Sequence, residues 1–205
     1  RESSEIWTKL IGKFNASNLL AIYSVGKLYN IDKIKLLTAI SMLESVVGRL
    51  QSFLSTNKVT VIVDYAHTPD AIENVISTIN KIKSSSQNLI TVIGCGGDRD
   101  KGKRSIIGKI CSDLSSKVIF TSDNPRSEDP KSIIEDMIDG VSKFNNDKIT
   151  VEIERSKAIK EAKENSVEGD IVLIAGKGHE DYQELKNNKR IQFDDFKIAK
   201  QIFNK

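Results

Sequence analysis

From residue 50 onward, short apolar runs alternate with segments of helical periodicity, and this alternation restricts the possible folds more than any other feature. The apolar runs cover residues 59–63, 88–94, 117–122, 149–153 and 170–176. The helical patterns cover residues 70–83, 103–114, 130–144, 156–165 and 194–203. Strands that are apolar throughout and separated by helices are typical of a mostly parallel sheet covered on both faces. The sequence therefore predicts a doubly wound α/β domain with ligands at the carboxyl ends of its strands.

The first 48 residues have a different pattern. Residues 17–29 and 33–45 place apolar side chains three and four positions apart, which predicts two amphipathic helices. Asp32 is suited to cap the second helix and Gly48 to end it. Two helices bury little surface, so we expect residues 1–48 to be one part of a larger domain and residues 49–205 to form the α/β domain. Because the chain opens without an initiator methionine, we also expect it to be a fragment.

Composition narrows the classes of function. Hydrophobic residues make up 39% of the chain and charged residues 29%, the balance of a globular protein. A net charge of +3 with only 6% aromatic residues gives no indication of nucleic-acid binding. No apolar run approaches the roughly 18 residues of a membrane span. Cys95 and Cys111 provide neither a disulfide framework nor zinc-ligand spacing, which suits a reducing cytoplasm.

Four of the five predicted strands are followed by a polar loop. These loops cover residues 64–70, 95–104, 123–126 and 176–180. The exception is the 149–153 strand, which leads into an ordinary helix N-cap sequence. Because the carboxyl ends of parallel strands meet at one edge of a sheet, we expect the four loops to lie close together.

Taken singly, the residues of these loops leave alternatives open. The glycines of residues 94–97 resemble a dinucleotide fingerprint, but the third glycine is misplaced, which favours a tight turn over a nicotinamide site. Asp64 could bind a ligand or cap its own turn. Arg126 could bind a carboxylate bidentately or form a surface ion pair. His67 and His179 could serve a site or be buried structural histidines.

Both signs of charge occur in these loops, and this is more informative than any one residue. The cations are Arg99, Lys101, Lys103, Arg104 and Arg126, and the carboxylates include Asp64, Asp70 and Glu180. Such a site could hold a small zwitterion, or a nucleotide by its phosphates and ribose. No metal-binding group is expected. The residues alone do not distinguish between these two kinds of ligand.

Four motifs together resemble the Mur ligase family. They are DYAHTPD (64–70), GCGGDRDKGKR (94–104), DNPR (123–126) and AGKGHEDYQ (175–183), in the order and loop positions of that family. GKFNASNLLA (12–21) and GR (48–49) are similar to the end of its central ATPase domain. The resemblance implies a Rossmann-like C-terminal domain preceded by a small helical remnant of the ATPase domain. It also implies an ATP-dependent, amide-forming ligase of peptidoglycan precursor synthesis.

The resemblance implies roles for individual residues. Asn15, Asn18, Arg49, Asp64 and His67 would be catalytic and nucleotide-binding positions beside ATP. The residues that would bind the incoming amino acid are Arg99, Asp123, Asn124, Pro125, Arg126, Gly176 and Glu180. The DNPR form goes with family members that add meso-diaminopimelate. The other expected ligands are a UDP-muramoyl dipeptide and Mg²⁺, whose protein ligands would lie mostly outside this chain, in a monomeric cytoplasmic enzyme without nucleic-acid or membrane partners.

Two departures from the family pattern limit the expectation. The GKT phosphate loop and the modified lysine of the ATPase domain do not occur in this sequence, so we expect no turnover by this chain alone. Gln51 also replaces an acid that is common after GR-x. The alternatives are a lysine-adding ligase and a stand-alone amino-acid-binding module.

Overall fold

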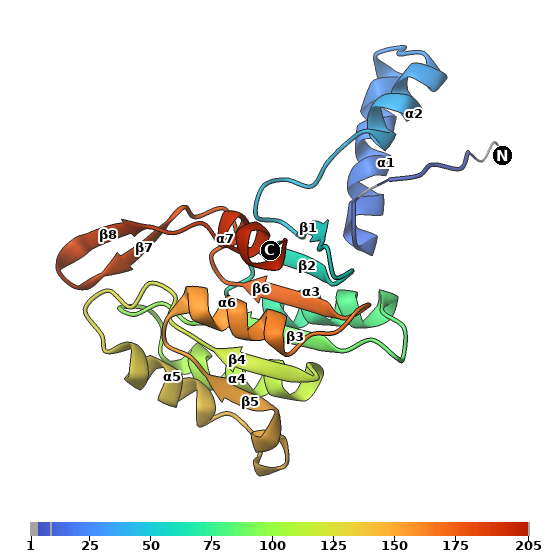
Figure 1. The fold of residues 1–205 in the computed structure, drawn as a ribbon. Helices are drawn as coiled ribbons and strands as arrows, with labels where there is room; N and C mark the ends of the chain where they lie inside the picture. The colour runs from blue at the N-terminus through green and yellow to red at the C-terminus, as the bar shows by residue number, and fades with distance from the viewer. Residues whose placement is uncertain (1–3, 9, 205) are drawn as a thin grey trace. The chain divides into compact units, whose positions relative to one another are not determined.

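The structure is a computed structural model that describes residues 4–8 and 10–204. The chain divides into two compact units, Arg1–Val46 and Val47–Lys205, drawn in Figure 1. The division falls after Val46, whereas the sequence led us to expect it after residue 48. The chain start, on which we based the expectation of a fragment, lies outside the described residues.

The first unit consists of two helices, α1 (Lys13–Leu28) and α2 (Lys33–Ser41). Asp32 caps α2 as predicted, since its Oδ1 accepts hydrogen bonds from the backbone N–H groups of Ile34 and Lys35 at 3.1 and 3.0 Å. The helix ends at Ser41, four residues earlier than predicted, so Gly48 does not end it. The buried core of this unit is small and comprises Leu19, Leu36 and Ile40.

The second unit is an α/β domain. In chain order its elements are β1 (Gln51–Leu54), β2 (Thr60–Asp64), α3 (Pro69–Ile82), β3 (Leu89–Ile93), α4 (Gly102–Leu114), β4 (Lys117–Phe120), α5 (Pro130–Ile138), a 3-10 helix (Lys143–Lys148), β5 (Ile149–Val151), α6 (Arg155–Glu164), β6 (Ile171–Ala175), β7 (Tyr182–Leu185), a 3-10 helix (Lys186–Asn188), β8 (Lys189–Gln192) and α7 (Asp195–Phe203).

Six strands form one sheet in the order β1-β2-β6-β3-β4-β5, and only β1 is antiparallel to its neighbour. The predicted mostly parallel, doubly wound sheet is therefore confirmed. Strand β1 and the antiparallel hairpin β7–β8 were not predicted. The predicted helix over 130–144 ends earlier, at Ile138. Gly140, just beyond it, lies against α4, where a Cβ would come within 1.8 Å of the Ser105 carbonyl oxygen.

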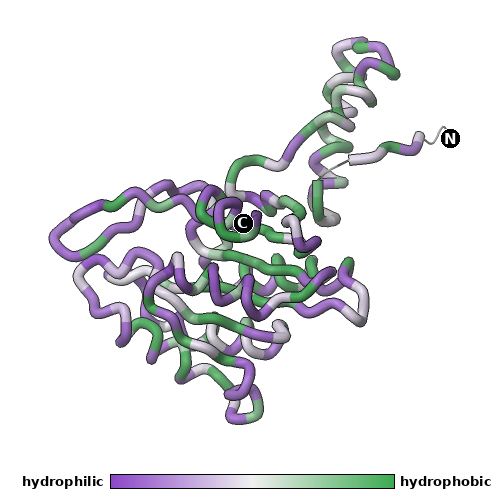
Figure 2. The backbone as a smooth tube through the Cα atoms, viewed as in Figure 1, coloured by the Kyte–Doolittle hydropathy of each residue, from purple (hydrophilic) through white to green (hydrophobic). Residues whose placement is uncertain are grey.

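Helices cover both faces of the sheet, which explains why its central strands are apolar throughout. On one face, Val63 and Val92 pack with Ile159 of α6 and Phe203 of α7. Alternate residues such as Ile62 point to the other face, which α3, α4 and α5 cover (Figure 1). Figure 2 shows the apolar strands at the centre and hydrophilic segments around them. None of the described helices has the length and apolar character to cross a membrane.

The carboxyl ends of β2, β6, β3 and β4 lie at one edge of the sheet, since these strands are neighbours and parallel. The four polar loops singled out from the sequence follow these four strands. This edge is therefore where a candidate site has to be sought.

Candidate functional site

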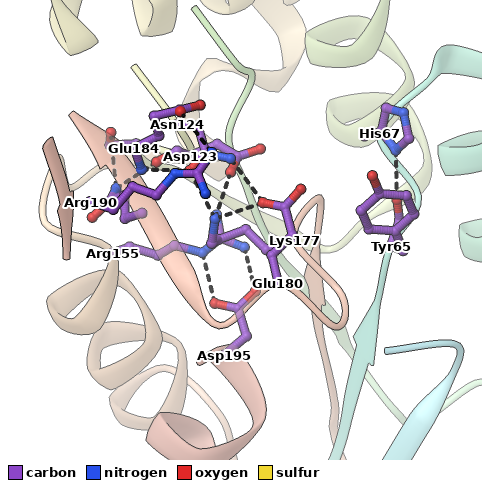
Figure 3. A network of polar contacts seen from close by, with 12 residues as sticks. Tyr65, His67, Asp123, Asn124, Arg155, Lys177, Glu180, Glu184, Arg190 and Asp195 are labelled. Carbon is purple, nitrogen blue, oxygen red and sulfur yellow. Dashed lines mark hydrogen bonds and ion pairs between the residues drawn. The ribbon is translucent and has the colours of Figure 1, made fainter. Parts of the chain in front are cut away.

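The loops after β4 and β6 meet in a network of polar side chains (Figure 3). Asp123 and Asn124 are buried just beyond the end of β4. The Asn124 side-chain Nδ2 donates a hydrogen bond to Glu180 Oε2 at 2.8 Å. Two residues that the sequence nominated on separate loops are thus in direct contact.

Lys177 lies at the centre of this network, and the sequence analysis did not single it out. Its side chain is 0% exposed. Its Nζ lies 3.0 Å from Asn124 Oδ1, 3.0 Å from Glu180 Oε2 and 3.4 Å from Asp123 Oδ1. Nothing in the local pattern Gly-Lys-Gly distinguishes a buried lysine from a solvated one, so only the tertiary structure reveals it.

Burial also affects Asp123. Loss of solvent raises the pKa of this carboxyl above its usual value, and the positive charges of Arg155 and Lys177 offset part of the rise. Its backbone carbonyl accepts a hydrogen bond from Gln183 Nε2 at 2.6 Å. The loop after β4 is therefore fixed to β7 as well as to the loop after β6.

Arg126 is held by the hairpin β7–β8. Its Nε donates to Glu184 Oε2 at 2.8 Å and its Nη1 donates to the Gly97 carbonyl oxygen at 2.8 Å. Arg190 donates to the other oxygen of Glu184 at 3.2 Å. Burial raises the pKa of Glu184, but the hydrogen bonds from Arg190 and Arg126 outweigh it, and the pKa lies below its usual value. The carboxylate is thus ionised between two guanidinium groups.

Arg99 lies near Arg126. A Cβ built on Gly96 would lie 3.1 Å from Arg126 Nη1 and 3.7 Å from Arg99 Cγ, so both side chains border Gly96. Arg99 is exposed, and its Nη1 donates to the Asp98 carbonyl oxygen at 3.1 Å. Because Arg126 and Glu180 are joined through Asn124 and its loop, these residues share one edge of the sheet.

Arg104, which the sequence placed among the cations of this edge, is instead a buried structural residue. It is 0% exposed and donates to both oxygens of Glu128, at 2.9 and 2.8 Å, and to Asp136 at 2.8 Å. The reason is its position on the first turns of α4, which points it toward α5 rather than toward solvent. It is not available to a ligand.

The glycines of residues 94–97 serve close packing. A Cβ on Gly94 would lie 2.3 Å from the Thr121 carbonyl oxygen, and one on Gly97 would lie 2.0 Å from the Pro125 carbonyl oxygen. Only glycine lets this loop approach the loop after β4 so closely. The structure favours the tight turn among the alternatives left open by the sequence.

A second cluster surrounds Tyr65 in the loop after β2. The Arg49 guanidinium lies 5.0 Å from the centre of the Tyr65 ring, and the rings of His67 and His179 lie 4.7 and 4.9 Å from it. Both histidines are exposed, so neither is a buried structural histidine. Figure 3 shows Tyr65 and His67 apart from the Lys177 network. This cluster offers a cation beside aromatic rings.

Asp64 fixes the chain next to this cluster. Its Oδ1 accepts from the Ala66 N–H and its Oδ2 from the Leu50 N–H, both at 2.7 Å. The residue is 4% exposed. It therefore caps its own turn, as one alternative held, and also holds the segment that carries Arg49.

Asn15 and Asn18 lie on α1, in the first unit. Asn18 Nδ2 donates to Asn15 Oδ1 at 3.2 Å, and Asn15 Nδ2 donates to the Ile11 carbonyl oxygen at 2.7 Å. Both side chains are thus engaged locally within that unit.

The two cysteines are unsuited to nucleophilic catalysis. Burial raises the pKa of Cys95 to about 12 and also raises that of Cys111. In the described part of the chain, no three His, Cys, Asp or Glu side chains come together as a metal-binding group.

In α/β domains with a mostly parallel sheet, ligands bind beside the carboxyl ends of the strands, where the charged loops of this chain gather. A model of the Mur ligase, glutamate ligase domain matches residues 48–178. The chain belongs to the Mur ligase family.

Similar proteins include two named UDP-N-acetylmuramoyl-L-alanyl-D-glutamate--2,6-diaminopimelate ligase. The one from Cytophaga hutchinsonii is 45% identical over 200 residues, covering 98% of this chain and 41% of its own. The one from Aquifex aeolicus is 46% identical over 198 residues, covering 97% and 40%. The chain thus spans about two fifths of the length of these relatives.

Solved structures are also similar to this chain. A ligase of the same name is 39% identical, with a TM-score of 0.76 over 97% of this chain and 40% of that one. UDP-N-acetylmuramate-alanine ligase from Thermotoga maritima, 19% identical, gives a TM-score of 0.64 over 98% of this chain and 40% of its own, which shows the shared fold alone.

Proposed function

We propose that this chain is the amino-acid-binding part of an ATP-dependent ligase that adds meso-diaminopimelate to UDP-N-acetylmuramoyl-L-alanyl-D-glutamate. The names of its relatives support this proposal. The observation that carries it is the gathering of Arg126, Asn124 and Glu180 at the carboxyl edge of the sheet. An arginine, an amide and a carboxylate in one place suit a ligand that has both an acid and an ammonium group.

The proposed chemistry follows from leaving-group quality. A carboxylate resists attack by an amine until one oxygen becomes part of a phosphate. ATP would phosphorylate the carboxylate of the dipeptide, the amine would attack the acyl phosphate, and inorganic phosphate would leave. The residues of this chain would bind and orient the amino acid whose amine attacks.

Arg126 would bind the distal carboxylate. A guanidinium has five N–H groups, and Arg126 uses two of them for Glu184 and Gly97. The other three have no hydrogen bond to the described residues. Arg99, beside Gly96, would share in anion binding.

Glu180 would accept a hydrogen bond from the distal ammonium, and Asn124 would donate to the carboxylate. Asp123, Pro125 and Gly176 would form the walls of the subsite. Gly176 has a φ of +114°, and a Cβ there would lie 3.3 Å from Asp123 Oδ2, which leaves little room for a side chain.

The nucleotide subsite would lie at the Tyr65 cluster. Arg49 would contact a phosphate, with His67 close by. Asp64 would hold the segment that carries Arg49, and its remaining lone pairs would accept a hydrogen bond from a ribose hydroxyl. In the whole enzyme, Asn15 and Asn18 would bind the nucleotide, as the resemblance to the family implies. Mg²⁺ would take its ligands from the phosphates and mostly from residues outside this chain.

We further propose that residues 1–48 are the C-terminal helices of a central ATPase domain. The first unit leaves large apolar side chains exposed, among them Leu20, Leu28, Ile34 and Met42. Side chains of this kind usually pack against other parts of a protein. The whole enzyme would act as a monomer in the cytoplasm.

Calorimetric titration of the chain with meso-diaminopimelate and with L-lysine tests the proposal. Lysine lacks the distal carboxylate, so three Arg126 N–H groups would lose their partner. We expect about 30-fold weaker binding, or about 2 kcal/mol. Arg126→Ala should reduce the difference to less than about threefold. Equal binding of both amino acids by the unaltered chain would contradict the proposed specificity.

A further inference from the structure

Lys177 is a charged side chain with no exposure and no role assigned so far. Burying an ammonium group is costly unless several acceptors compensate. Lys177 finds three acceptors, on Asp123, Asn124 and Glu180. These acceptors belong to two loops, after β4 and after β6, that border the proposed amino-acid subsite.

The orientation of the Asn124 amide follows from its donors. Oδ1 accepts from Lys177 Nζ at 3.0 Å and from the Glu184 backbone N–H at 2.9 Å. Both groups can only donate, so the oxygen must face them. Nδ2 must then face Glu180, to which it donates at 2.8 Å. One N–H of the amide remains for a ligand.

The same ammonium determines which Glu180 oxygen is available. Oε2 accepts from Lys177 Nζ at 3.0 Å and from Asn124 Nδ2 at 2.8 Å. Oε1 accepts no hydrogen bond from the described residues. The subsite thus presents one amide donor and one carboxylate acceptor, side by side, to whatever enters.

We infer that Lys177 is the positioning residue of the amino-acid subsite, which fixes Asn124 as the donor to a ligand carboxylate and Glu180 Oε1 as the acceptor for a ligand ammonium. The inference rests on the proposed function. Lys177 itself need not touch the ligand, because its three N–H groups are used within the protein. Without it, Asn124 Oδ1 keeps one donor, the Glu184 backbone N–H, and Glu180 Oε2 keeps one donor, Asn124 Nδ2, so both groups are held in place less firmly.

Lys177→Met removes the ammonium while keeping most of the side-chain volume. Calorimetric titration should show meso-diaminopimelate binding about 30-fold more weakly, as expected for losing an ordered donor and acceptor. The preference over L-lysine should fall at the same time. Lys58→Met is the matched control, because Lys58 forms an exposed ion pair with Glu168, and it should change affinity less than about twofold.

The outcomes separate the two proposals. If the unaltered chain does not bind meso-diaminopimelate, the proposed function fails at this subsite. If it binds and folded Lys177→Met binds equally well, or more tightly, only the positioning role is wrong.

The unaltered chain gives a further measurement that does not depend on a folded variant. NMR signals of the Asn124 side-chain amide should show slow hydrogen exchange and one fixed orientation. A freely rotating amide would overturn the inference.

Discussion

Arg126 adopts a backbone φ of +50°, a region that costs a residue with a Cβ about 1–2 kcal/mol. Contacts with Glu184 offset this cost. The Arg126 N–H donates to the Glu184 carbonyl oxygen at 3.1 Å, and the two side chains form an ion pair at 2.8 Å. Backbone and side chain of β7 therefore hold the guanidinium in place before any ligand arrives.

Glu184 should consequently contribute to stability as well as to the site. Glu184→Gln leaves Arg126 and Arg190 without a charged partner, and we expect the free energy of unfolding to fall by about 1–2 kcal/mol. Urea denaturation at pH 7 measures this. Glu168→Gln, which alters the exposed pair with Lys58, should leave the free energy of unfolding almost unchanged. Equal losses in both variants would mean that the hairpin does not brace Arg126.

At the scale of elements, Arg104 joins α4 to α5. Its guanidinium meets Glu128, which precedes α5, and Asp136 within α5. The hydrogen bond from Arg104 is the largest of the effects that lower the pKa of Glu128 to about 2. A carboxyl whose pKa is lowered on folding stabilises the fold above its usual pKa near 4.5 and loses that effect as the pH falls toward 2.

Glu128→Gln should therefore destabilise the protein by about 3 kcal/mol at neutral pH, because it leaves a buried guanidinium with one carboxylate. Urea denaturation at pH 7 and pH 3 provides the test. The difference between the variant and the unaltered chain should shrink at the lower pH, because Glu128 is protonated in the unfolded chain at pH 3 and must lose that proton on folding. A difference that stays constant would show that folding does not lower the pKa of Glu128.

The elements that the sequence predicted correctly are those whose signal is local. Strands β2 to β6 and the five helices of the second unit each carry their own apolar pattern. Strand β1 is only partly buried along its length, and the hairpin β7–β8 is largely polar, so neither carries the buried apolar run that marks a strand in the sequence. The burial of Arg104 and of Lys177 also depends on tertiary contacts and could not be predicted from the sequence. A charged residue in a polar loop or first helical turn looks solvated until tertiary structure buries it.

The edge of the sheet where the loops gather could be predicted because parallel topology alone brings the strand ends together. The contact between Asn124 and Glu180 could not be predicted from topology, because it depends on how two loops fold. Both residues were predicted to bind the amino acid because their motifs resemble those of the family, and not because of the spacing between them. No sequence pattern predicted the network of Lys177 and Glu184, which holds Asn124, Arg126 and Glu180 in place.

At the scale of the whole molecule, the two units have cores of very different size. The second unit has an apolar sheet packed on both faces, whereas the described core of the first unit consists of Leu19, Leu36 and Ile40 with a few partly buried neighbours. Isolated helices shorter than about 12–15 residues are marginal in water, and α2 has nine. The stabilities of the units should differ accordingly.

Native-state hydrogen exchange followed by mass spectrometry measures this difference. We expect amides of α2 to exchange at least about 100-fold faster than those of β3 and β6, because local opening of a small core requires far less free energy than unfolding of the sheet. Urea well below the main transition should abolish protection in α1 and α2 first. Equal protection in both units would contradict the expectation, since the three-residue core of the first unit would then have to be as stable as the sheet.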